Sequence, residues 1–348
     1  GEYWLLSGGR RGHIGVWDLD LSGDGVELKL VKITEPTFEI RQEVVFQYLI
    51  PPKNWSPWGE HKKLAKDEWI EIIALLVGRR DLHKGCTIMS IQFNTESGKL
   101  ILDSSRFEHF SGENSKASSM VFWKDYLVVG MGQQLTFISN ETEERDTIIE
   151  FEFECPSEIC CLAVVNRKEK EKGQFLVVGG MDKKIRWYIS AEDSHNSLTK
   201  VHSVKAHSSR LSCMIVHNNI LYSGGGASDP GIKSWKPADE CEVVDGKRVP
   251  GEIKSYSGHS DAILSMGFLG PWLISGSAKG DGSMRVWNLE EENSVQARIT
   301  PHDAIHALLP LNDKILITGG NSGARKMCIW STENISCTLK SNGSCIIQ

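Results

Sequence analysis

The chain repeats one short pattern. An apolar strand runs into Ser-Gly or Gly-Gly, a polar turn follows, and a second apolar strand ends on tryptophan. The copies of this pattern end at Trp17, Trp187, Trp235, Trp287 and Trp330. A unit that recurs in this way is one supersecondary element used many times. The repeat therefore constrains the fold more strongly than any single motif does.

The spacing of the repeat predicts the number of units. The last four tryptophans are 48, 52 and 43 residues apart, which suits a four-stranded antiparallel unit of roughly 40–45 residues with enlarged loops. The 170 residues between Trp17 and Trp187 leave room for two more units. We expect strands there at 69–77, 87–94, 118–123, 126–130 and 134–139, with Phe93 and Phe137 in the tryptophan's place. The tally predicts an all-β fold of seven units.

Two of the units carry polar residues in register with their tryptophan. These residues are His207, Ser223, Asp229 and Trp235 in one unit, and His259, Ser275, Asp281 and Trp287 in the other. The pattern resembles the WD40-repeat family, in which an indole N–H, a serine hydroxyl, an imidazole and a turn carboxylate form a hydrogen-bonded tetrad. The resemblance implies a seven-bladed β-propeller of four-stranded antiparallel blades. The match weakens elsewhere, because His302, Thr318 and Trp330 lack the turn aspartate.

The two ends of the chain fit a closed ring. The chain opens directly on the strand Tyr3–Ser7, so its first blade lacks an innermost strand. The final residues 344–348 resemble the inner strand at 158–162, and we expect them to complete the first blade and close the propeller. We therefore expect a single domain over residues 1–348, with an inserted loop at about 51–69. A start inside a repeat also suggests a fragment of a longer chain, from which a targeting segment could have been removed.

Composition favours a reducing, aqueous environment. Apolar residues make up 40% of the chain, its mean hydropathy is −0.26, and no apolar run approaches the length of a membrane span. The nine cysteines show no zinc-type spacing. We expect them to be reduced and mostly buried. These features predict cytoplasmic and/or nuclear localisation, without membrane insertion.

The sequence contains no recognisable active site. Phosphate-binding loops, dinucleotide fingerprints, HExxH and Gly-x-Ser-x-Gly are all absent. The histidines that stand before predicted inner strands suit structural tetrads better than general bases. We expect a chain with no catalytic activity, no cofactor and no metal.

The turns that follow each Gly-Gly or Ser-Gly are unusually basic for a chain whose net charge is −6. If the strands are assigned correctly, these turns lie on one rim. The predicted basic rim consists of Arg10, Arg11, His13, Arg79, Arg80, Lys84, Lys183, Lys184, Lys279, Arg325 and Lys326. It suits a phosphorylated or acidic segment. The alternative is that surface turns collect basic residues and nearby acids offset them.

The insertion near residue 51 carries Trp55 and Trp58 outside the repeating pattern. Tryptophan in an irregular loop either packs back on the fold or anchors a partner. Both interpretations remain open for these two residues.

These observations favour a non-catalytic protein–protein interaction scaffold or recognition subunit of an intracellular multiprotein complex. Its partners would be other proteins, and its basic rim would bind an acidic or phosphorylated peptide. One alternative is a nucleic-acid-binding propeller that uses the same rim, which would show a steep dependence of affinity on salt. Another is an accessory or substrate-recognition domain of a larger enzyme, such as a ubiquitin ligase or a kinase.

Overall fold

The structure is a computed structural model of the 348-residue chain. It describes residues 3–8, 14–20, 27–33, 45–49, 69–77, 85–94, 97, 100–111, 117–139, 149–169, 171, 173–191, 194–249, 251–290, 302–311, 313–321 and 327–331. Strands dominate these residues, which include the 3-10 helix η2 (Ala238–Glu240) and no α-helix. The all-β prediction is confirmed. Contacts divide the chain into unit 1, Gly1–Ile159, and unit 2, Cys160–Gln348.

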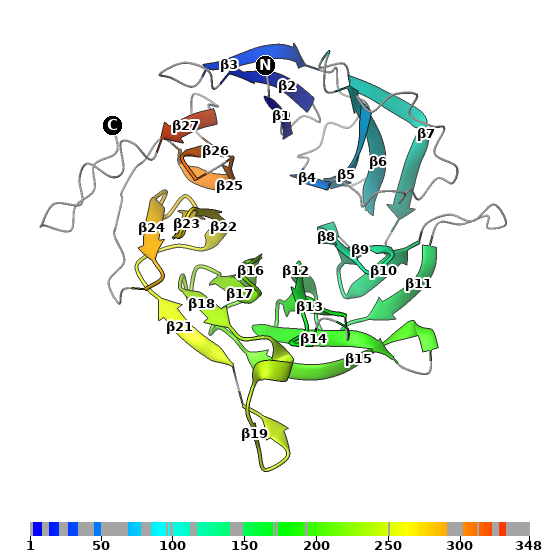
Figure 1. Ribbon diagram of the computed structural model, residues 1–348, viewed down its shortest axis with the longest axis vertical. Coiled ribbons are helices and arrows are strands. Elements are labelled where there is room, and N and C mark those ends of the chain that lie inside the picture. Colours follow the sequence, from blue (N-terminus) through cyan, green and yellow to red (C-terminus); the bar gives the residue numbers. More distant parts are fainter. Residues whose placement is uncertain are drawn as a thin grey trace, which may run out of the picture. The chain divides into compact units, whose positions relative to one another are not determined.

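Unit 1 contains three antiparallel sheets, in which strands adjacent in sequence pair with one another (Figure 1). The first sheet comprises β1 (Tyr3–Gly8), β2 (Ile14–Asp20) and β3 (Glu27–Ile33). The second comprises β4 (Val45–Leu49), β5 (Trp69–Val77), β6 (Gly85–Asn94) and β7 (Leu100–Ser111). The third comprises β8 (Ala117–Trp123), β9 (Tyr126–Met131), β10 (Gln134–Ile138) and β11 (Ile149–Glu154).

Unit 2 begins with two four-stranded antiparallel sheets. The first comprises β12 (Ile159–Asn166), β13 (Gln174–Gly180), β14 (Lys184–Ala191) and β15 (Ser194–Lys205). The second comprises β16 (Leu211–His217), β17 (Ile220–Gly225), β18 (Ile232–Trp235) and β21 (Glu252–Tyr256). Between β18 and β21 the chain inserts η2 (Ala238–Glu240) and a small hairpin, β19 (Val243–Val244) and β20 (Lys247–Arg248).

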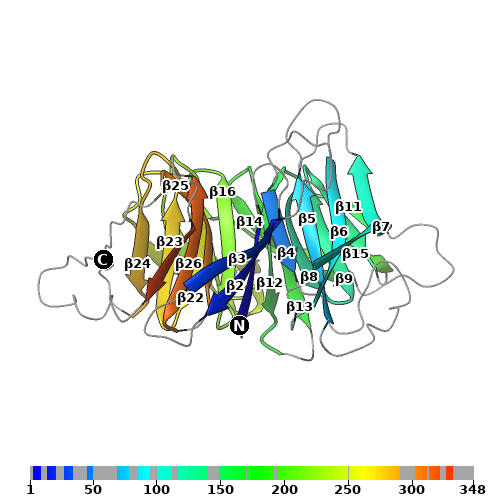
Figure 2. The ribbon, with the colours of Figure 1, turned by 90° about the horizontal axis from the view of Figure 1, so that it is seen from above.

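Two three-stranded sheets complete unit 2. They comprise β22 (Ile263–Leu269), β23 (Trp272–Ser277) and β24 (Met284–Asn288), then β25 (Ala304–Pro310), β26 (Ile315–Asn321) and β27 (Met327–Ser331). Successive sheets contact one another through their first strands, with β16 against β22 and β22 against β25 (Figure 2).

The strand register corrects two of the expected tryptophan positions. Leu221 of β17 pairs with Trp235, just after a β-bulge in the pairing of β18 with its outer neighbour. In β14 the position equivalent to Trp235 is occupied by Tyr188, because Tyr188 pairs with Leu176 and follows an equivalent bulge. Trp187 therefore comes one residue too early in the chain to occupy the tryptophan position. In β10 the pairing partner and the preceding bulge assign the tryptophan position to Ile138 rather than to Phe137. The side chain of Phe93 lies outside the described residues.

The core of unit 2 lies between successive sheets. Ile263, Leu273 and Trp287 form one buried cluster, and Ile305 packs with Ile274 and other apolar residues of the preceding sheet in a second. Polar side chains also join the sheets. The hydroxyl of Ser265 donates to the carbonyl of Ile305 at 3.0 Å, and the thiol of Cys213 donates to that of Ile263 at 3.4 Å. The inner strands β16, β22 and β25 therefore make specific contacts, each with the next.

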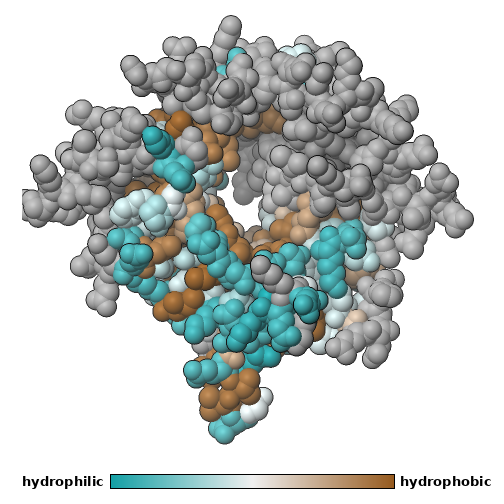
Figure 3. Space-filling model, in the orientation of Figure 1, coloured by the Kyte–Doolittle hydropathy of each residue, from teal (hydrophilic) through white to brown (hydrophobic). Residues whose placement is uncertain are grey.

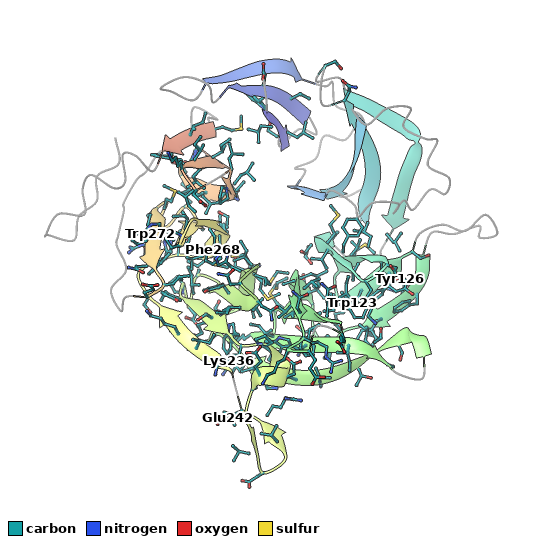
Figure 4. The ribbon with its side chains drawn as sticks, in the orientation of Figure 1. Trp123, Tyr126, Lys236, Glu242, Phe268 and Trp272 are labelled. Carbon is teal, nitrogen blue, oxygen red and sulfur yellow. The ribbon has the colours of Figure 1, made fainter. Side chains whose placement is uncertain are left out.

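The core of the third sheet in unit 1 is aromatic. Phe137 stacks on Phe151 with ring centroids 4.0 Å apart, and Trp123 and Tyr126 pack edge-on against Phe137 (Figure 4). Aromatic rings bury large apolar areas and prefer such geometries. Phe and Glu alternate along β11, and the ring of Phe151 packs on this cluster, as expected of a half-buried edge strand.

Two sheets of unit 2 approach each other closely at Gly276, so we expect one methyl group added there to lower the stability markedly. A Cβ atom at Gly276 would lie 2.5 Å from Cγ2 of Ile305, whereas one at the equivalent Gly319 would lie 3.7 Å from its nearest neighbour. We expect Gly276→Ala to lower the free energy of unfolding by about 2 kcal/mol through overpacking. Gly319→Ala is the matched control and should change it by less than about 0.5 kcal/mol. Equal denaturation midpoints for the two variants would contradict this packing.

Two expectations fall outside the described residues. The final strand at 344–348 and the inserted loop at 51–67 are not among them, so closure of a seven-bladed ring and a single domain over 1–348 stay predictions. No helix in the described ranges is both long and apolar enough to cross a bilayer.

Candidate partner-binding surface

A chain of hydrogen bonds ties the turns of the sheet β22–β24 together. The indole N–H of Trp287 donates to Oγ of Ser275 at 2.7 Å, and Nε2 of His259 lies 2.7 Å from the same hydroxyl. The other imidazole nitrogen, Nδ1, lies 2.5 Å from the carboxylate of Asp281. The imidazole and hydroxyl are fully buried. Buried polar groups need such partners, so this network fixes the turn that contains Asp281.

The environment keeps His259 neutral. Burial lowers the pKa of this histidine to about 4, although the neighbouring carboxylate of Asp281 opposes the shift. A neutral imidazole that donates from Nδ1 to Asp281 accepts the Ser275 hydroxyl proton at Nε2. With both nitrogens occupied inside the fold, His259 has no free nitrogen to offer a substrate. Its role is structural.

Two neighbouring sheets carry related networks. In β16–β21, Ser223 lies 2.9 Å from Nε2 of His207 and accepts the indole N–H of Trp235 at 2.9 Å, while Asp229 lies 3.4 Å from Nδ1. In β25–β27, Thr318 contacts both His302 at 3.1 Å and Trp330 at 3.0 Å. Nδ1 of His302 is buried without a hydrogen-bond partner in the structure. The networks hold the turns of unit 2 in place.

Two turns of unit 2 lie directly against each other. The carbonyl of Lys183, in the β13–β14 turn, accepts the backbone N–H of Ala206 at 2.9 Å, in the turn after β15. Asp182 faces inward, where its carboxylate binds both terminal nitrogens of the buried Arg186. Although burial opposes the shift, these contacts hold the pKa of Asp182 below its ordinary value. The carboxylate of this turn is therefore already paired with the guanidinium of Arg186.

Cations gather where these turns meet. Lys184 and Lys205 are directly opposite each other across the β14–β15 ladder, and both are exposed. Lys183 precedes the first, and Arg210 ends the turn that begins after the second; both are exposed as well. We call Lys183, Lys184, Lys205 and Arg210 the basic corner. None of them lies within ion-pair distance of an acid in the described ranges, although Lys184 helps to lower the pKa of the nearby Asp182 carboxyl.

Comparison with known proteins agrees with this geometry. The family model "WD domain, G-beta repeat" matches residues 251–288, the segment that holds the complete tetrad of His259. The crystal structure of the C-terminal WD40 domain of Sif2 superposes with a TM-score of 0.56 over 97% of this chain and 81% of that one, at 16% identity. The chain therefore contains a WD40 repeat and shares the fold of WD40 domains.

Two curated relatives come from Arabidopsis thaliana. This WD40 chain is 24% identical over 273 residues to "Cell division cycle 20.1, cofactor of APC complex", covering 68% of this chain and 53% of the relative. It is 22% identical over 216 residues to "Cell division cycle 20.5, cofactor of APC complex", covering 51% and 47%. The chain thus spans about half the length of the curated relatives it matches.

Only part of the predicted basic rim can be placed on this WD40 fold. Lys183 and Lys184 belong to the basic corner, whereas Lys279 lies 3.7 Å from the carboxylate of Asp303 and is offset by it. The remaining rim residues, and the two insertion tryptophans, lie outside the described residues; they are Arg10, Arg11, His13, Arg79, Arg80, Lys84, Arg325, Lys326, Trp55 and Trp58.

Sequence reasoning missed Lys205 and Arg210. Lys205 directly precedes Ala206-His207, and Arg210 stands three residues after His207, just before the next inner strand. Basic residues near a tetrad histidine were the available signal. Across the residues described, no three His, Cys, Asp or Glu side chains are grouped to hold a metal ion.

Proposed function

We propose that this WD40 chain is a non-catalytic recognition subunit of a multiprotein complex, and that its basic corner binds an acidic or phosphorylated segment of a partner protein. The coarse part of the proposal is consistent with relatives named as cofactors of the APC complex. The finer part is carried by one observation, the exposed lysine pair at positions 184 and 205.

Charge gives the physical reason. Like charges directly opposite each other in an antiparallel ladder destabilise it, by roughly 0.2–1 kcal/mol. A phosphate or carboxylate between the two ammonium groups removes that repulsion and gains two charge-assisted contacts. Arg210, at the other end of the turn that follows Lys205, is exposed and carries a guanidinium, a group that suits bidentate contacts with phosphate. The corner is therefore more favourable with an anion bound than without one.

The same proposal places the protein in the cytosol or the nucleus. Burial raises the pKa of the Cys161 thiol well above its usual value and that of Cys213 to about 12. These thiols sit in the inner strands β12 and β16, where they fill space as small apolar side chains. Free buried thiols suit a reducing compartment.

The single variant Lys184→Glu tests the proposal. It places an acid opposite Lys205, so we expect the melting temperature to stay unchanged or to rise slightly. Binding of a fluorescein-labelled peptide that carries two phosphoserines among acidic residues should nevertheless weaken at least about tenfold, or about 1.4 kcal/mol. Fluorescence anisotropy measures the affinity, and the unphosphorylated peptide should bind more weakly to the wild-type chain.

Lys200→Glu is the matched control. Lys200 is exposed on β15, the strand of Lys205, but pairs with Tyr188 rather than with a lysine, and Lys200→Glu should leave phosphopeptide binding unchanged. Equal losses in both variants would show a general charge effect and overturn the assignment of the corner. A single-stranded oligonucleotide that binds more tightly than the phosphopeptide, with a steep inverse salt dependence, would favour nucleic acid instead.

A further inference from the structure

The insertion between β18 and β21 has a firmly held base. The backbone N–H of Lys236 donates to the carbonyl of Gly251 at 2.8 Å, which closes the insertion where it leaves and re-enters the sheet. Inside this closure Ala238 and Cys241 are buried, and Nη1 of Arg248 donates to the carbonyl of Ala238 at 2.8 Å. Figure 4 labels Lys236 and Glu242, which lie at this base.

The base is also tied to the preceding sheet. A carboxylate oxygen of Asp239 accepts the backbone N–H of Lys168, in the β12–β13 turn, at 2.9 Å. Ala238 belongs to the buried cluster that contains Trp187 and Val204. The insertion therefore rests on two sheets at once, and the hairpin beyond it starts from a fixed position.

The hairpin itself is well formed but has open edges. Its Asp245-Gly246 turn has positive φ angles of 49° and 73°, as a two-residue hairpin turn requires, and Val249 N–H donates to the carbonyl of Glu242 at 2.8 Å. In the described residues β19 pairs with β20 alone. Because hydrogen-bonded and non-hydrogen-bonded pairs alternate in such a ladder, the N–H and C=O of Val243 point away from β20.

Apolar side chains concentrate on this hairpin. Val243 is 57% exposed, Val244 is 53% exposed and Val249 is 38% exposed, and Ile253 on the adjoining edge strand β21 is 46% exposed. They are four of the six large apolar side chains exposed in the described residues. Figure 3 shows hydrophobic surface on the projecting hairpin, beyond a hydrophilic surface at its base. Successive valines face opposite sides, so both faces of the hairpin meet water.

We propose that β19 is a docking strand, whose open edge pairs with an extended segment of a partner protein that carries apolar residues flanked by Lys or Arg. The free backbone groups of Val243 supply the pairing, and the exposed valines supply apolar contact. The charges at the two ends of β19 select the partner. Glu242 stands at one end and Asp245 at the other, both exposed, and neither forms an ion pair with another described residue.

The same charges disfavour a second copy of this chain. In a two-fold antiparallel pair of β19 strands centred on Val243, the Glu242 and Asp245 side chains of both copies would gather four carboxylates along one short ladder, and charges of like sign repel one another. A basic-flanked segment removes this repulsion. The docking strand is separate from the basic corner and takes a partner segment of opposite charge, so either proposal can fail without the other.

A peptide library tests the docking strand. A phage library of random nine-residue peptides is selected on the full chain, and the enriched peptides are measured by anisotropy against variants. We expect the enriched sequences to alternate apolar residues and to carry flanking Lys or Arg. The double variant Glu242→Gln/Asp245→Asn should weaken their binding at least about tenfold without moving the melting temperature, because asparagine tolerates the positive φ of the turn.

Val243→Pro separates edge pairing from charge. It removes an N–H that points away from β20, so the hairpin keeps its own hydrogen bonds while the open edge loses a donor. Binding should again fall at least about tenfold, whereas Lys200→Glu should leave it unchanged. Enriched peptides that bind both hairpin variants as well as the wild type would overturn the proposal, and so would a dimer of this chain that dissociates on Val243→Pro.

Discussion

Ser275→Ala should lower the free energy of unfolding by about 3–4 kcal/mol. Oγ of Ser275 accepts the indole N–H of Trp287 and contacts Nε2 of His259, so its removal leaves two buried polar groups without a partner. Each such group costs about 1–3 kcal/mol. The midpoint of urea denaturation, followed by tryptophan fluorescence, measures the loss.

The variant Ser275→Thr is the control, because the last sheet of this chain has a threonine at the equivalent position. Thr318 occupies the equivalent position in the last sheet and contacts both His302 and Trp330 through its hydroxyl. Ser275→Thr should therefore keep most of the stability that Ser275→Ala loses. If the two variants were equally destabilised, packing rather than hydrogen bonding would hold this position.

Acidification should lower the free energy of unfolding by about 3 kcal/mol through the same network. Burial lowers the pKa of His259 from 6.5 to about 4, so the unfolded chain takes up a proton that the folded chain refuses. The stabilisation is complete above pH 6.5 and is lost progressively as the pH falls towards about 4, at about 1.4 kcal/mol per pH unit for one proton. Urea denaturation at pH 7, 6 and 5 follows the loss.

The variant His259→Gln isolates this histidine from the others. Burial also lowers the pKa values of His202, His207 and His302, and these groups act in the same direction. The dependence of stability on pH should be shallower in His259→Gln by about one proton between pH 6.5 and 4.5. An unchanged slope would mean that His259 is protonated in the folded state.

The repeat in the sequence was sufficient for the fold class, because period and polar register are local properties. Strands expected at 69–77, 118–123 and 126–130 agree with β5, β8 and β9 within a residue or two. Strand faces were harder to predict. Trp187 and Tyr188 are both buried aromatic residues next to each other. The register of β14 on β13, which pairs Tyr188 with Leu176, decides which of the two takes the tryptophan's position. Local sequence does not reveal that register.

The two candidate surfaces also depend on strand register and packing, which the local sequence does not show. Lys183 and Lys184 were recognised from the turn they share, but Lys205 joins them only through the register of the long strand β15. The Asp245-Gly246 pair, which lies between apolar and basic residues, predicts the hairpin at Val243. The repeat spacing alone indicated only an enlarged loop there. The exposure of the hairpin follows from the buried Ala238 and Cys241 at its base, which only the packing reveals.

The thiol of Cys213 gives unit 2 an internal reporter. It donates to the carbonyl of Ile263 in the next sheet, and its pKa of about 12 leaves almost no thiolate at neutral pH. Because the thiolate is the reactive form, an alkylating reagent should react slowly with this thiol while the two sheets stay together. Alkylation of this cysteine therefore times the separation of adjacent sheets in the native protein, without any added label.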